Sequence, residues 1–130
     1  MNISELKSVI DERIRNCDEL QDNWNYGIEQ CWKRLIDVLS ENISETIDFI
    51  LNSCSDEELF WISEVFEDIA EQTQSKEFTE ALRRRLERVT RENYRQENFK
   101  SKLMRDEIDF DEFQRSVSEE IENAEAKLKQ

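Results

Sequence analysis

The chain contains no histidine, which removes the side chain most often used for general acid–base catalysis and for binding transition metals. Its single glycine, Gly27, excludes the glycine-rich loops that bind phosphates and dinucleotides. Carboxylates are plentiful, but without histidine, glycine-rich turns or a pocket signature they do not indicate hydrolase chemistry. We therefore predict no catalytic residues, no cofactor and no enzymatic activity.

Three cysteines, Cys17, Cys31 and Cys54, form no C-x-x-C pair. An odd number of separated cysteines favours buried free thiols in a reducing compartment over a disulfide. Residues 1–10 lack the apolar core of a signal peptide, and no run approaches the roughly 18 apolar residues of a membrane span. We expect a soluble, cytoplasmic protein that does not bind membranes.

Charge is the strongest signal in the composition: 18 Lys and Arg against 32 Asp and Glu give a formal net charge of −14. Such a surface repels nucleic acid and anionic membranes and attracts basic proteins. Residues 76–105 are the exception, with 10 basic and 5 acidic side chains, and they include Arg83, Arg84, Arg85, Arg88, Arg91 and Arg95. Pairing with acids three or four residues away, and charge balance within a bundle, explain this segment better than a nucleic-acid site does.

The elements that position these residues are predicted to be helices. No proline and one glycine cannot supply the turns of a sheet, and apolar residues recur three and four apart throughout the 130 residues. We predict one all-α domain over residues 1–130, a single compact bundle or short stack of six or seven antiparallel helices. Helices are expected over 3–21, around 28–39, from Asn42, over 55–73, from Ser75 and around 113–128, with a turn over 22–27. Residues 93–104 either continue the fifth helix or form a separate short one.

The helix expected over 55–73 has the clearest start, because Ser55 and Glu58 form a capping box. At 100° per residue its apolar side chains fall in one arc and its acids on the opposite side, flanked by two large aromatic residues. An aromatic residue ringed by polar ones is typical of an interface hot spot. The predicted partner-binding residues are Glu57, Phe60, Trp61, Glu64, Glu67, Asp68 and Glu71. The alternatives are a merely solvated acidic face, or a neighbouring helix that covers Trp61 or Phe60.

A second acidic run, residues 106–112, resembles a cation-binding loop at first sight. It lacks the turn glycine and the spaced bidentate glutamate of a calcium-binding EF-hand, so no metal site is predicted. The run serves instead as the reserve partner-binding site, with Asp106, Asp109, Asp111 and Glu112.

Part of the chain resembles a known family. The similar residues are Glu58-Leu59, Trp61, residues 63–66, Asp68-Ile69, residues 73–75 and Phe78, with Leu39-Ser40 and residues 46–50 upstream. They resemble small, acidic, all-helical immunity proteins of bacterial contact-dependent growth inhibition and related polymorphic toxin systems. The match covers about a third of the chain.

The resemblance implies a cytoplasmic binding protein that neutralises the toxic domain of a secreted effector, one inhibitor to one toxin. Such toxins are often nucleases, RNases in particular, and a nuclease surface is basic because it binds phosphates. The expected partner is therefore a cognate toxin domain, with the free protein a monomer. Two rivals stay open: a helical adaptor that binds another basic protein, and a transcription-associated protein that uses the basic segment.

Overall fold

The computed structural model describes residues 1–21 and 23–129, and along these residues it contains helices and no strands, which confirms the predicted all-α class. The elements are α1 (Ile3–Leu20), α2 (Asn25–Ser40), α3 (Ile43–Asn52), α4 (Asp56–Ile62), the 3₁₀ turn η1 (Ser63–Val65), α5 (Phe66–Thr73), α6 (Lys76–Glu87), the 3₁₀ turn η2 (Gln96–Asn98), α7 (Lys102–Glu107) and α8 (Phe110–Ala126). When α4, η1 and α5 are counted as the one helix expected over 55–73, the α-helices number seven.

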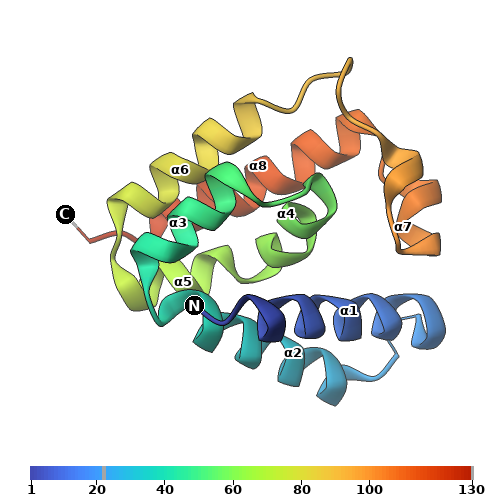
Figure 1. The fold of residues 1–130 in the computed structure, drawn as a ribbon, viewed down its shortest axis with the longest axis horizontal. Helices are drawn as coiled ribbons and strands as arrows, with labels where there is room; N and C mark the ends of the chain where they lie inside the picture. The colour runs from blue at the N-terminus through green and yellow to red at the C-terminus, as the bar shows by residue number, and fades with distance from the viewer. Residues whose placement is uncertain (22, 130) are drawn as a thin grey trace.

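The segment from α4 to α5 lies at the centre of the molecule (Figure 1). The α1–α2 hairpin packs on one side of it, and α6 and α8 pack on the other, with α3 against α6. Leu59, Ile62, Val65, Phe66 and Ile69 from this segment are fully buried in the shared core. Because neighbours pack on several sides of this segment, little of its surface is exposed, and some of the partner-binding residues predicted on it are buried.

Side-chain caps define four of the helix starts. Asn2, Asn42 and Ser75 each accept a hydrogen bond from the backbone N–H three residues on. Ser55 accepts from the Glu58 N–H at 3.1 Å, and the Glu58 carboxylate accepts from the Ser55 N–H at 2.9 Å. The capping box is complete, and it fixes where the central segment begins.

The prediction of one unbroken helix over 55–73 is wrong. The Ser63 hydroxyl donates to the Phe60 carbonyl at 2.5 Å, and the chain tightens there into η1 before Val65 leaves helical geometry with φ −117° and ψ 10°. A 3₁₀ turn rotates about 120° per residue instead of 100°, so three residues shift the later side chains by about 60°. The acids of α5 therefore do not continue the face that begins at Glu57.

The turn expected over 22–27 is also shorter than predicted, because α2 already begins at Asn25; Asp22 lies outside the described residues. Gly27 is needed for packing within α2. A Cβ atom there would lie 2.2 Å from Cε3 of Trp24, whose ring rests on the glycine. The open question over 93–104 is resolved as a separate short helix, α7, after the η2 turn.

Candidate protein-binding surface

Two of the predicted contact residues, Glu57 and Trp61, are buried and belong to the core. Trp61 is 2% exposed and Glu57 is 8% exposed. The indole Nε1 donates to Oε2 of Glu57 at 3.2 Å, and the same carboxylate accepts from the backbone N–H groups of Lys100 at 2.6 Å and Ser101 at 3.1 Å. Placing these two side chains on an exposed face was wrong, since residues distant in sequence cover them.

Glu64 is also bound by other side chains of the protein. Its two carboxylate oxygens accept from Nε and one terminal nitrogen of Arg13, both at 2.8 Å, and Oε1 accepts from Nε1 of Trp32 at 3.3 Å. Arg13 is 4% exposed, and its guanidinium lies 4.9 Å from the Trp61 ring centre. Glu64 neutralises a buried cation, so it is not the exposed partner-binding acid that the 100° helical spacing predicts.

Phe60 lies at the boundary between core and surface. Its ring packs edge-on against Trp61 with centres 5.1 Å apart and contacts Phe99 at 6.1 Å. The side chain is half-buried and lines a surface hollow of about 320 Å³. Of the two aromatic anchors proposed from the sequence, Phe60 is the one that a partner can reach.

The hollow brings together three parts of the chain. It is lined by Trp32 from α2, by Phe60, Ser63 and Glu64 from the central segment, and by Ser116 and Glu120 from α8. Sequence reasoning missed Trp32 and Glu120. The one local signal for Glu120 is that Ser116 and Glu120 are four residues apart, which places them on one side of a helix.

The hollow borders an acidic face, defined here as Glu67, Asp68 and Glu71 of α5 with Glu120 of α8. Burial and the nearby carboxylates of Glu67 and Glu64 raise the pKa of Glu120. Burial, Glu67 and Glu71 likewise raise the pKa of Asp68. Lys127 counters part of this charge, with Nζ 3.4 Å from Glu67 and 3.7 Å from Glu71. The raised pKa values mean that the negative charges of Asp68 and Glu120 are disfavoured here, first by partial burial and then by the like charges beside them.

Most acids of the reserve partner-binding site cap a helix or pair with an arginine of the same chain. Asp109 caps α8 by accepting from the Glu112 N–H at 2.8 Å. Asp111 pairs with Arg91, and Glu112 pairs with Arg115 at 2.6 Å. Asp106 is exposed at the end of α7. Three of the four acids therefore have roles inside the chain, and this run is a weaker candidate than the acidic face.

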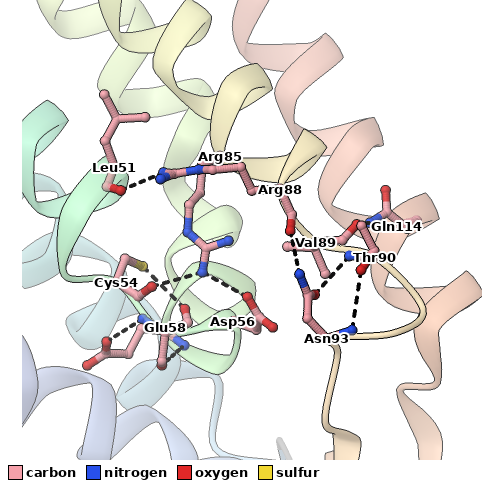
Figure 2. Close-up of polar contacts among 11 residues, drawn as sticks. Leu51, Cys54, Asp56, Glu58, Arg85, Arg88, Val89, Thr90, Asn93 and Gln114 are labelled. Carbon is pink, nitrogen blue, oxygen red and sulfur yellow. Dashed lines mark hydrogen bonds and ion pairs between the residues drawn. The ribbon is translucent and has the colours of Figure 1, made fainter.

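Arginines of the basic segment contact several parts of the molecule, and Figure 2 shows two of them, Arg85 and Arg88. Arg85 is buried and donates to the Cys54 carbonyl and to Asp56, each at 2.8 Å, while Arg88 donates to the Leu51 carbonyl at 2.5 Å. Arg83 pairs with Glu125 on α8. These contacts join the C-terminal half of α6 and Arg88 after it to α3, to the start of α4 with the loop before it, and to α8, so much of the basic charge is used in packing.

The chain matches no protein-family model, no curated protein and no solved structure. Within residues 1–21 and 23–129, no helix is long and apolar enough to cross a membrane. Over the same residues, no group of three or more Cys, Asp or Glu is arranged to hold a metal ion. What the surface binds must therefore be inferred from its shape and charge.

Proposed function

We propose that this chain is an immunity-type inhibitor that binds a basic toxin domain in the cytoplasm of the producing cell and neutralises it without catalysis. The observation that carries the proposal is the acidic face beside an aromatic-lined hollow, where the gathered carboxylates of α5 and α8 add their repulsion to the cost of burying Asp68 and Glu120. A cationic partner surface would relieve that repulsion. The resemblance to immunity proteins supports the same function.

The nature of the toxin follows from charge complementarity. A nuclease domain must present lysines and arginines to bind phosphates, and those residues suit this face. RNase domains are favoured because the resemblance implies them. Inhibition then follows if the bound inhibitor covers the substrate surface.

The experiment uses the C-terminal domain encoded by the reading frame next to this chain's gene. That domain is expressed in a bacterial host with the parent chain or with the Glu67→Lys/Glu71→Lys/Glu120→Lys variant. We expect the parent to restore growth and the variant to fail. The matched control, Glu41→Lys/Glu80→Lys/Glu92→Lys, makes the same charge change at exposed acids elsewhere and should protect.

Two results would contradict the proposal, provided that circular dichroism shows all variants folded. Protection by the acidic-face variant equal to the parent would remove this surface as the site. A neighbouring domain that is not toxic would favour the adaptor alternative, which uses the same charge complementarity toward another basic protein.

A further inference from the structure

The turn between α1 and α2 carries an exposed aromatic pair. Trp24 is 50% exposed and Tyr26 is 63% exposed, and their ring centres are 6.1 Å apart. Leu20 beside them is 41% exposed. These three, with Ile3 at the far end of α1, are the large apolar side chains that stay exposed among the described residues. Exposed Trp and Tyr are the residues most enriched among interface anchors.

Trp24 is held in place by its packing. The indole rests on Gly27, where any Cβ would come within 3 Å of three ring atoms. The only glycine of the chain thus makes room for the ring of an exposed tryptophan. It does so at a helical position where alanine would otherwise stabilise the helix more than glycine does. A side chain fixed before binding loses less conformational entropy when a partner packs on it.

Side chains of α2 line surface hollows between this turn and the acidic face. A second hollow, of about 300 Å³, is lined by Arg13, Asn25, Ile28, Glu29 and Trp32. Trp32 also lines the hollow that contains Glu64 and Glu120. The two hollows therefore share Trp32 as a lining residue, and Asn25, which lines the first one, follows Trp24 in the chain. Eight residues separate Trp24 from Trp32, which is about 12 Å along a helix axis.

We propose that this groove along α2 binds an extended basic segment of the partner protein, with an arginine side chain in the hollow at Glu120 and an apolar side chain on Trp24. A guanidinium group stacks on aromatic rings and pairs with a carboxylate, and the hollow offers Trp32, Phe60 and Glu120. At about 3.3 Å per extended residue, the two anchoring side chains are about four residues apart. A second copy of this chain is a poor occupant, because both copies carry a net charge of −14.

The inference takes the basic character of the partner from the proposed function, but its chemistry can be tested without the toxin. The chain has three tryptophans, and each indole N–H gives its own signal in a ¹⁵N-labelled sample. Trp24 reports on the turn between α1 and α2, and Trp32 reports on the hollow that contains Glu120. The buried Trp61 is an internal control. The first probe is N-acetyl-arginine amide, compared with the uncharged N-acetyl-citrulline amide of nearly the same shape.

We expect the arginine probe to shift the Trp32 signal in a saturable way, with no response at Trp61 and little response to citrulline. The Glu120→Gln variant should weaken that binding at least about fivefold. The second probe, acetyl-Phe-Gly-Gly-Gly-Arg amide, should shift Trp24 and Trp32 together and bind about tenfold more tightly than the single residue. Equal responses to arginine and citrulline, or a pentapeptide that moves only one of the two signals, would overturn the proposal.

The Gly27→Ala variant tests, in the toxin-protection assay, whether the packing of the Trp24 ring on Gly27 matters for binding. We expect the variant to stay folded and to weaken protection, whereas Gln30→Ala, an exposed change on the same helix, should not. If the peptides fail to bind while the parent still protects, the groove is wrong and the proposed function stands. If the peptides bind but the neighbouring domain is not neutralised, the groove stands and the proposed function fails.

Discussion

Arg13 and Glu120 are charged side chains in opposite situations. Arg13 is buried beside an indole ring, and Glu64 supplies a carboxylate that pairs with it through two hydrogen bonds. Glu120 lines a hollow with other carboxylates nearby, and both its burial and those neighbours make its negative charge less favourable. The Arg13–Glu64 pair stabilises the fold, whereas the charge of Glu120 costs stability. Replacing Glu64 by glutamine and replacing Glu120 by glutamine should therefore have opposite effects.

Glu64→Gln should destabilise the protein by about 2 kcal/mol, because Arg13 would remain buried without this carboxylate. The measurement is equilibrium unfolding in urea. Glu67→Gln is the matched control, since Glu67 pairs with Lys127 at the surface, and such pairs contribute about 0.5 kcal/mol. Equal losses in the two variants would contradict the assigned role of Glu64.

Glu120→Gln should stabilise the protein at pH 7 by a few tenths of a kcal/mol, on the order of other like-charge pairs on helices. Because the pKa of Glu120 is raised in the folded state, that state holds the proton more tightly than the unfolded chain. Stability therefore falls as pH rises from the usual value of 4.5 through the raised one. Unfolding measured between pH 4 and pH 7 should show less of this fall in the variant; a loss of stability at pH 7 would contradict it.

The three thiols should be unreactive in the folded protein. Cys17, Cys31 and Cys54 are buried and form no disulfide, and burial raises the pKa of Cys54 to about 12. A thiolate is the reactive form, so a disulfide reagent at pH 8 should modify none of them within minutes. The same reagent in guanidinium chloride should modify all three. Rapid native labelling of Cys54 would contradict its placement.

At the scale of helices and loops, the central segment and residues 99–103 depend on each other. Glu57 accepts from two backbone N–H groups of this loop, as described above. Asp18 at the end of α1 accepts from the Ser101 hydroxyl at 2.6 Å and from the Lys102 N–H at 2.8 Å. Two carboxylates from different helices thus hold the start of α7.

Asp18→Asn should lower stability at pH 7 and flatten the acid side of the stability profile. Partial burial acts to raise the pKa of Asp18, but hydrogen bonds from Ser101, Lys102 and Leu103 outweigh it and hold that pKa below the usual 3.8. The stabilisation is therefore present above the usual value and is lost as pH falls through the lowered one. Thermal unfolding from pH 2 to pH 7 measures this, and identical profiles for parent and variant would contradict the role.

Ser55→Ala should destabilise the protein by about 1 kcal/mol, because it removes one half of the capping box at the start of α4. Ser8→Ala, an exposed change within α1, serves as the control and should have little effect. Urea unfolding at pH 7 distinguishes the two. A cap that contributed nothing would give both variants the same midpoint.

These contacts show which parts of the structure are predictable from sequence. Caps at Asn2, Asn42, Ser55 and Ser75 could be predicted because donor and acceptor are three residues apart. The burial of Trp61 could not, because Arg13 lies over its ring and its partner Glu57 is bound by Lys100 and Ser101, all distant in sequence. The hollow was missed for the same reason: Trp32, Glu64 and Glu120 are brought together only by tertiary packing.

At the scale of the whole molecule, the net charge of −14 should act over distances of about a Debye length. Association with the basic toxin domain that we propose as the partner should therefore slow by about tenfold or more between 0.05 and 0.5 M salt. The Glu67→Lys/Glu71→Lys/Glu120→Lys variant should associate more slowly and lose most of that salt dependence. Trp24→Ala should change mainly the dissociation rate. Surface plasmon resonance gives both constants, and a salt-independent association rate would exclude steering by this face.

The pairing of Glu64 with Arg13 also bears on how such a protein could diversify. Glu64 is tied to the core through Arg13, so a change at this wall of the hollow threatens folding. Asp68, Glu71 and Tyr26 are exposed and Glu120 is half-buried, so substitutions there should leave the core intact. Variation could therefore accumulate at these positions and give the same scaffold a new partner. An engineer who wished to redirect its specificity would randomise these four residues and keep Arg13 and Glu64 unchanged.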